Sequence, residues 1–362
     1  MRVYKSTLNN KLRNGIALSI IAQIGIVSWL SGKPDLVEKF YSNGIYPVIS
    51  TFFRILFGWI PFSIGEIIYT FLIILAVRYL IKKRKRIRAN KRAFIRDIIM
   101  VLSIFYFTFY LVWGLNYYRE PLANKLEIKN QATYDEIKKL TSDLIKKTNQ
   151  IQIKITGDST KIVQVPYTRN EVFEKTIDHY TLLAQELPFL AYQKPSIKKS
   201  MFSILSSYMG IGGYLNPFTN EAQVNRKTPL FRFPVVSGHE IGHQIGYSAE
   251  NETNFIGYLV TAKNEDIYFQ YSAYAYALSH CLNAIYSRDQ NASKELYKQL
   301  NEGVIQNYRE LQDFNKAYEN PFEPIFKSIF STFLKVNNQK DGIRSYGKVV
   351  NLMVGYHKRY PL

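Results

Sequence analysis

Two histidines and a glutamate in the middle of the chain have the spacing of a hydrolytic metal site. His239, Glu240 and His243 form the pattern H-E-x-x-H. On a helix, positions i and i+4 lie on one face, so both imidazoles can reach one zinc ion while Glu240 faces the water that completes the coordination shell. Zinc lowers the pKa of that water towards about 7, and a carboxylate beside it can take the proton and deliver it to a leaving group. These residues therefore predict a zinc hydrolase with Glu240 as its general base.

A catalytic zinc ion usually has three protein ligands and one open position, so a third ligand is expected nearby. Gly246 is typical of a helix end, and Ser248 can cap a second helix that carries Glu250, Glu252 and Asn254. We expect Glu250 to be the third ligand, with Glu252 as its rival. Asn254 is expected to orient a histidine through the ring nitrogen that the metal leaves free.

The metal segment resembles the gluzincin metallopeptidases, whose H-E-x-x-H is followed on a second helix by E-x-x-A-[DN]. Residues 250–254 read E-N-E-T-N, with threonine in place of alanine, and only six residues separate His243 from Glu250. The resemblance implies a zinc-dependent peptidase with a zincin-like fold. It also implies a peptide substrate that lies along an edge strand beside the metal helix, which would fall around residues 208–225.

The layout of the whole chain resembles a bacterial membrane family known only as domain of unknown function 3810. The likeness lies in three apolar stretches near the N-terminus, the glycine-rich stretch 210–214, the segment 216–225 and the zinc motif.

Three apolar stretches approach the roughly 20 residues that a helix needs to cross a bilayer. They are residues 16–30, 64–81 and 98–115. A fourth stretch, 46–62, is interrupted by prolines, a glycine and an arginine, so we expect an interfacial or re-entrant segment. The loop 82–96 contains nine lysines and arginines and no acidic residue, which predicts a cytoplasmic location. Three spans would then place everything after Leu115 outside the cytoplasm.

The net charge of +19 does not indicate a nucleic-acid partner. Residues 1–115 contain 17 Lys and Arg against 4 Asp and Glu, which leaves 30 against 24 for residues 116–362. A DNA or RNA binder needs a more concentrated basic face than this. The one cysteine, Cys281, excludes an internal disulfide. The expected partners are instead the lipid bilayer and a peptide or protein substrate.

Beyond the apolar stretches the sequence has the pattern of a mixed helical and strand domain. Two capping boxes predict helices over 133–148 and 168–187. The glycine-rich segment 197–225 predicts strands and a hairpin. We therefore predict an α+β fold, with a membrane anchor of three transmembrane helices over 1–115. Residues 116–362 would form a mostly helical, zincin-like domain with a small antiparallel sheet.

The expected function is that of a multi-pass, membrane-anchored zinc metallopeptidase with its hydrolytic domain outside the cytoplasm. One alternative is a non-catalytic membrane protein with a structural zinc site, which needs a fourth protein ligand such as His179 or His280. The other is a zinc hydrolase acting on cell-envelope groups, because the motif determines the water chemistry but not the bond that is cleaved. Tyr346 or Arg344 is a candidate hydrogen-bond donor to an oxyanion.

Overall fold

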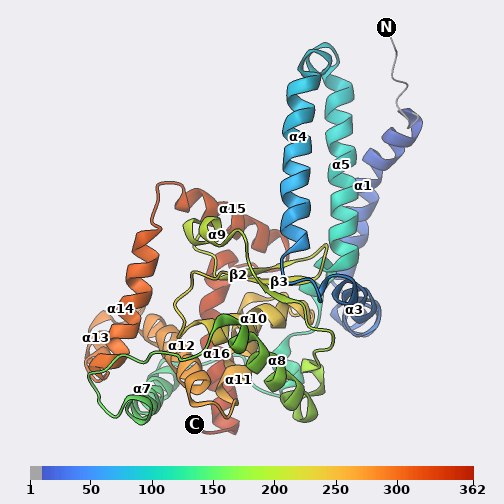
Figure 1. Ribbon diagram of the computed structural model, residues 1–362. Helices are drawn as coiled ribbons and strands as arrows, with labels where there is room; N and C mark the ends of the chain where they lie inside the picture. Colours follow the sequence, from blue (N-terminus) through green and yellow to red (C-terminus); the bar gives the residue numbers. More distant parts are fainter. Residues whose placement is uncertain (1–9) are drawn as a thin grey trace.

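Three long helices rise from one side of a mainly helical body (Figure 1). The computed structural model describes residues 10–362, apart from the side chains of Arg86, Ile343, Ser345 and Tyr346. The long helices are α1 (Asn10–Ser31), α4 (Ile64–Ala89) and α5 (Lys91–Val112). Within the described residues, these three helices are long and apolar enough to cross a membrane, as the sequence predicted.

The basic segment between α4 and α5 was expected to be a loop, but it is helical on both sides of a single break at Asn90. Lysine and arginine are good helix formers, so α4 continues through them to Ala89. The Asn90 side chain then accepts a hydrogen bond from the Ala93 N–H at 3.0 Å and caps α5. This basic hairpin lies at the end of the helices that is remote from the body (Figure 1).

Short helices connect α1 to α4 and lie against the body. They are α2 (Pro34–Leu36), η1 (Val37–Ile45) and α3 (Tyr46–Phe57). One face of α3 is buried through Tyr46, Ser50 and Arg54, at intervals of four residues, whereas Phe52 and Ile55 on the other face are exposed. Such an amphipathic helix favours the interfacial location predicted for this segment.

The body consists of helices around one small sheet. Its helices are α6 (Leu122–Lys125), α7 (Tyr134–Thr156), α8 (Arg169–Glu186), α9 (Ser203–Tyr208), α10 (Phe233–Gln244), α11 (Glu250–Ala262), α12 (Ile267–Tyr286), α13 (Gln290–Tyr297), α14 (Glu302–Ala317), α15 (Glu323–Val336) and α16 (Val349–Arg359), with short 3₁₀ segments η2 (Gly114–Tyr118), η3 (Pro188–Leu190) and η4 (Gly342–Lys348). The two predicted capping boxes are present, at Thr133 before α7 and at Thr168 before α8. The largest buried apolar cluster includes residues of α7, α10, α11, α12 and α16.

The sheet has three short strands in the order β1–β3–β2. They are β1 (Ile197–Lys199), β2 (Gly213–Asn216) and β3 (Glu221–Val224). β2 and β3 are antiparallel, but β1 runs parallel to β3, so the prediction of an antiparallel sheet was wrong. The chain between β1 and β3 reverses twice, through α9 and β2, and can therefore enter β3 in the direction of β1.

Residues 203–208 lie within the segment 197–225 that was expected to form strands and a hairpin, and they form α9. Serine side chains stabilise this helix locally. The Ser203 hydroxyl donates to the Ser200 carbonyl at 2.6 Å, and the Ser207 hydroxyl donates to the Ser203 carbonyl at 2.9 Å. Such local side-chain contacts compete with strand pairing.

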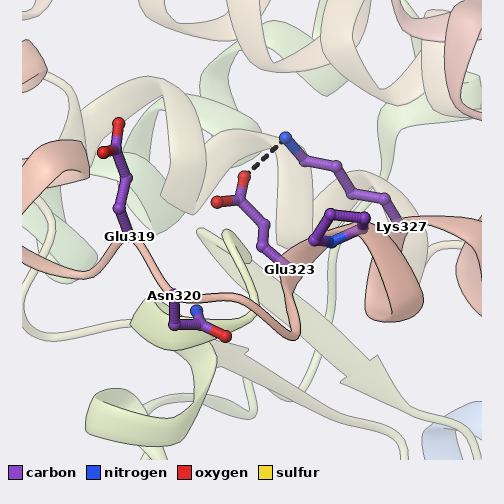
Figure 2. Close-up of a pocket in the computed structure, with 5 residues that line it drawn as sticks. Glu319, Asn320, Glu323 and Lys327 are labelled. Carbon is purple, nitrogen blue, oxygen red and sulfur yellow. Dashed lines mark ion pairs between the residues drawn. The ribbon is translucent and has the colours of Figure 1, made fainter.

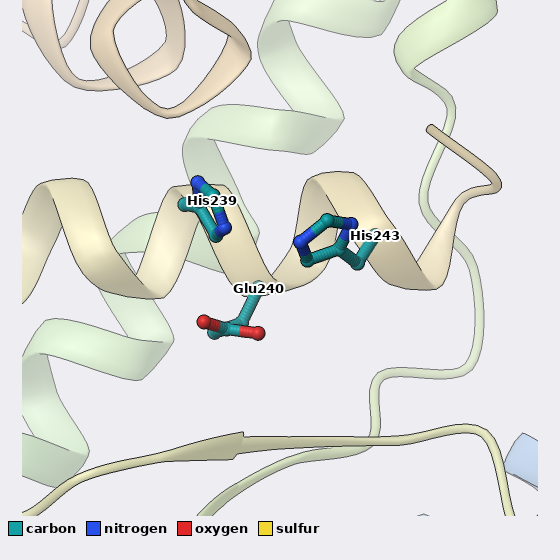
Figure 3. A group of neighbouring side chains, drawn as sticks. All are labelled: His239, Glu240 and His243. Atoms are coloured by element: carbon teal, nitrogen blue, oxygen red, sulfur yellow. The ribbon is translucent and has the colours of Figure 1, made fainter. Parts of the chain in front are cut away.

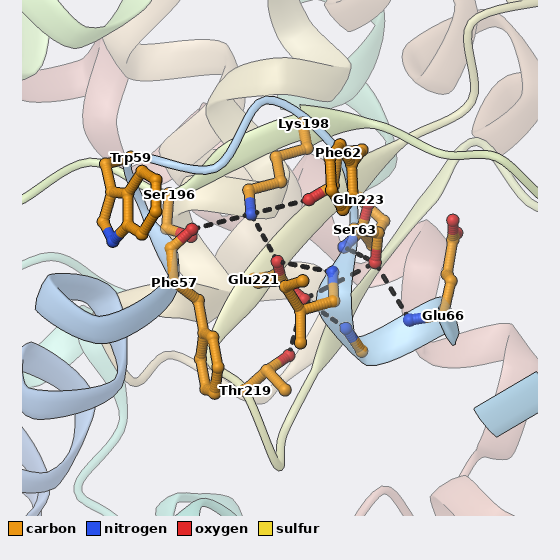
Figure 4. Close-up of polar contacts among 12 residues, drawn as sticks. Phe57, Trp59, Phe62, Ser63, Glu66, Ser196, Lys198, Thr219, Glu221 and Gln223 are labelled. Carbon is orange, nitrogen blue, oxygen red and sulfur yellow. Dashed lines mark hydrogen bonds and ion pairs between the residues drawn. The ribbon is translucent and has the colours of Figure 1, made fainter. Parts of the chain in front are cut away.

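Buried charged side chains join the first turn of α4 to the sheet (Figure 4). The Glu221 carboxylate of β3 accepts hydrogen bonds from the N–H groups of Gly65 at 2.6 Å and Ile64 at 3.1 Å. Negative charge is favourable at a helix N-terminus, so Glu221 stabilises the start of α4. Lys198 of β1 forms an ion pair with Glu221, and Glu66 of α4 accepts hydrogen bonds from the chain that follows β1. A long apolar helix is thereby anchored on the sheet.

Candidate metal centre

The side chains of the H-E-x-x-H motif lie close together on α10 (Figure 3). The rings of His239 and His243 are nearly perpendicular, with centroids 4.6 Å apart. One ligand atom from each of His239, Glu240 and His243 lies within 4.8 Å of the others, so the group could hold a metal ion. The i, i+4 spacing produces the face that the sequence predicted.

Glu250, at the start of α11, reaches both histidines. Its Oε2 atom is 3.5 Å from Nε2 of His239 and 3.6 Å from Nε2 of His243. Ligand atoms around a tetrahedral zinc ion, with bonds of about 2.1 Å, are about 3.4 Å apart. Both distances from Glu250 to the histidines therefore match the separation between two ligands of one ion.

Glu252 is directed elsewhere. Its Oε1 atom accepts a hydrogen bond from the backbone N–H of Leu122 at 2.7 Å. Burial raises the pKa of Glu252 to about 7, an effect that this N–H and Arg119 partly offset. The structure therefore brings Glu250 to the histidines and places Glu252 at the start of α6.

Both histidines are held in position through a second contact. The Nδ1 atom of His243 lies 2.8 Å from the carbonyl oxygen of Tyr247. When Nδ1–H of His243 donates a hydrogen bond to that carbonyl, Nε2 is left unprotonated and can face Glu250. The side chain of Asn254 forms a hydrogen bond with His239. Each ring is thus oriented by a group outside the motif, in the way that metal-binding histidines usually are.

Burial shifts the pKa values of all three motif side chains, and the Glu250 carboxylate outweighs it at one histidine. Burial lowers the pKa of His243, but the Glu250 carboxylate outweighs burial and raises the pKa to about 9. Burial, reinforced by the neighbouring His243, lowers the pKa of His239 to about 4. Burial also raises the pKa of Glu240 to about 8, and the Oε2 atom of Glu240 has no hydrogen-bond partner among the described residues. A cation bound beside the motif would be attracted by the carboxylates of Glu240 and Glu250.

The close approach of α11 to α10 depends on a glycine. A Cβ atom at Gly257 would lie 2.8 Å from the Val235 carbonyl oxygen and 2.9 Å from the backbone nitrogen of His239. Contacts this short would force the two helices apart. Glycine at this position therefore lets Glu250, two turns earlier on α11, meet the histidines of α10.

Strand β2 passes directly beside the Glu240 carboxylate. A Cβ atom at Gly213 would lie 2.4 Å from Oε1 of Glu240 and 2.7 Å from the carbonyl oxygen of Gln223. β2 pairs with β3 alone, so among the described residues it is an edge strand of the sheet. The main chain of an edge strand is thus within reach of the motif.

A family model described as "Protein of unknown function (DUF3810)" matches residues 41–354. The chain belongs to this family. The matched DUF3810 region begins in η1 and ends in α16, so it includes α4, α5, the sheet and the metal centre. No curated protein and no solved structure matches the chain.

Sequence reasoning missed four side chains of this DUF3810 protein that bind carbonyl groups at the end of α10. Tyr46 and Arg54 donate hydrogen bonds to the Gln244 carbonyl, at 2.7 and 3.2 Å. Trp113 donates to the His243 carbonyl at 3.2 Å, and Arg119 donates to the Gly246 carbonyl at 2.8 Å. The end of a helix carries partial negative charge, which such donors neutralise. Arginine within an otherwise apolar segment was the available signal, because an ionisable group there normally has a partner.

Other candidate residues lie away from the metal centre. His179 is buried on α8, and His280 packs against Tyr276 with ring centroids 4.5 Å apart. Neither belongs to the metal-binding group found among the described residues. Arg344 is exposed on η4, and the side chain of Tyr346 lies outside the described residues. A surface hollow of about 590 Å³, lined by Glu319, Asn320, Glu323, Pro324 and Lys327, contains none of the metal residues (Figure 2).

Proposed function

We propose that this DUF3810 protein is a membrane-anchored, zinc-dependent peptidase. The proposed zinc ligands are His239, His243 and Glu250, and Glu240 is the proposed general base. The observation that carries the proposal is the position of Glu250, whose Oε2 atom is almost equally distant from the Nε2 atoms of the two histidines. Two imidazoles and one carboxylate are a ligand set typical of catalytic zinc.

Each proposed role follows from the surroundings of a side chain. When bound, zinc supplies a Lewis acid that lowers the pKa of water to about 7. Glu240 takes a proton from the attacking water at its carboxylate and later passes it to the amine leaving group. Tyr247 and Asn254 fix the orientation of the two imidazoles.

A peptide is the substrate that the surroundings of Glu240 favour. An extended peptide can add a strand to an exposed sheet edge. β2 offers such an edge, and the fit of Gly213 against Glu240 would bring the main chain of a paired peptide close to the base. We propose that the body lies outside the cytoplasm, because the basic hairpin after α4 is at the opposite end of the long helices (Figure 1).

The proposal is tested on the full-length protein purified in detergent, with zinc content and hydrolysis of a peptide library measured on the same samples. We expect about one zinc ion per chain. The variant Glu240→Gln should keep its zinc and lose turnover by about 10²- to 10⁴-fold, because the general base is removed. Glu295→Gln, an exposed change on α13, is the control. Undiminished hydrolysis by Glu240→Gln would contradict the proposal.

A further inference from the structure

Helix α15 carries a row of exposed apolar side chains along one face. Ile325, Ile329 and Val336 are 55%, 65% and 67% exposed, and Phe322 just before the helix is 61% exposed. The opposite face packs on the protein through Leu334, which is fully buried. A soluble surface rarely exposes several large apolar side chains on one helix face unless something else covers them.

The C-terminal end of α15 is attached to the end of an apolar helix. The ring of Phe333 lies 6.0 Å from that of Phe109 in the last turn of α5, measured between centroids. The Tyr110 hydroxyl, also in that turn, donates to the side-chain oxygen of Asn337 at 2.9 Å. The position of α15 relative to α5 is therefore fixed.

The N-terminal end of α15 is connected to α4 indirectly, through α9. The side-chain amide of Asn320 donates to the Tyr208 carbonyl at the end of α9 at 2.7 Å. Before α9, the N–H of Met201 donates to Glu66 in the first turn of α4 at 2.7 Å. Helix α9 itself exposes Ile204 and Leu205. Both α9 and α15 lie on the side of the body from which α4 and α5 rise (Figure 1).

The length of α5 indicates where the row on α15 lies relative to a bilayer. Its 22 residues extend for about 33 Å at about 1.5 Å per residue. A bilayer has a hydrocarbon core of about 30 Å, so the last turn of α5 would lie at its edge. Because the C-terminal end of α15 contacts that turn, this end of the exposed row is at the same level, where amphipathic helices insert their apolar face about 5 to 10 Å into the lipid.

We propose that α15, together with α9, lies in the bilayer interface with Ile325, Ile329 and Val336 inserted among the lipids of the adjacent leaflet. The body is then held against the membrane by a second contact besides its three long helices. This contact requires neither a metal ion nor hydrolysis.

The test uses the full-length protein in nanodiscs of phosphatidylcholine with brominated acyl chains, which quench a fluorophore within the bilayer. A thiol-reactive dye is attached to Ile329→Cys and, separately, to Ile325→Cys. Cys281 is buried and should not react, which labelling of the unchanged chain checks. Ile153→Cys is the matched control, because Ile153 is an exposed isoleucine on α7, far from the long helices in Figure 1.

We expect the dye on α15 to lose most of its fluorescence in brominated nanodiscs relative to unbrominated ones, whereas the dye at position 153 keeps it. Equal quenching at positions 329 and 153 would overturn the proposal. So would an absence of lipid quenching combined with energy transfer between labels on two copies of the chain, which would show that a second copy covers the row.

Discussion

At the scale of single residues, the candidate metal centre depends on which glutamate of α11 faces the histidines. Glu250 and Glu252 are two residues apart on one helix, so their side chains point in different directions. Glu250 meets Nε2 of both histidines, and Glu252 meets the backbone of Leu122. The sequence predicted that both carboxylates lie near the site. It could not predict that Glu252 contacts α6, because that segment lies more than a hundred residues earlier in the chain.

Replacing each glutamate by glutamine should have different effects on metal binding. Glu250→Gln removes the anionic ligand, so its zinc affinity should fall beyond the roughly 10- to 100-fold loss typical of an outer-shell partner. Glu252→Gln keeps an oxygen that can accept the Leu122 N–H, so zinc should remain. Competition with a chelator in the full-length protein measures both affinities. Loss of zinc from Glu252→Gln with retention in Glu250→Gln would reverse the assignment.

At the scale of elements, the centre is formed where α11 and β2 both approach α10. Each approach requires a glycine, because a Cβ atom at Gly257 or Gly213 would overlap α10 or Glu240. The sequence predicted α10, α11 and the capped helices α7 and α8, since those patterns are local. It could not predict that β1 pairs parallel to β3, because strand direction depends on how the intervening α9 and β2 pack.

The approach of β2 to Glu240 can be tested with two neighbouring glycines. Gly213→Ala places a Cβ atom 2.4 Å from Oε1 of Glu240, so the strand or the carboxylate must move. A displacement of about 1 Å at a reacting group can cost about 100-fold in turnover. At Gly212 the nearest atom, on Val236, is 3.6 Å away, so Gly212→Ala is the matched control. We expect peptide hydrolysis to fall in Gly213→Ala alone, with zinc content unchanged in both. Similar activity in the two variants would contradict this account of β2.

At the scale of the whole molecule, the segments that precede and follow the long helices contact the body. The sequence suggested a membrane anchor over 1–115 and a separate domain after it. Tyr46 donates to the backbone of Gln244, 198 residues later, and Trp113, directly after α5, donates to that of His243, so the two predicted parts contact each other. Contacts between residues this far apart leave no local pattern in a single sequence. Helix α10, which carries the H-E-x-x-H motif, is thus held by the segments that lead into and out of the long helices.

The ion pair between Lys198 and Glu221 should be important for this connection, because both side chains are buried. Glu221→Gln leaves the lysine as an uncompensated buried charge, which typically costs about 3 to 5 kcal/mol. The double variant Glu221→Gln with Lys198→Met removes that charge and should regain part of the loss. Thermal unfolding in nanodiscs, followed by circular dichroism, compares the variants. Unchanged unfolding of Glu221→Gln would show that the pair does not anchor α4.

The central claim is that His239, His243 and Glu250 share one zinc ion. X-ray absorption at the zinc edge of the purified full-length protein tests this claim most directly. We predict two imidazole nitrogens and one carboxylate oxygen at about 2.0 to 2.2 Å, with a water oxygen in the fourth position. A shell of four protein ligands would contradict a catalytic site, and a protein that takes up no zinc would contradict the metal centre itself.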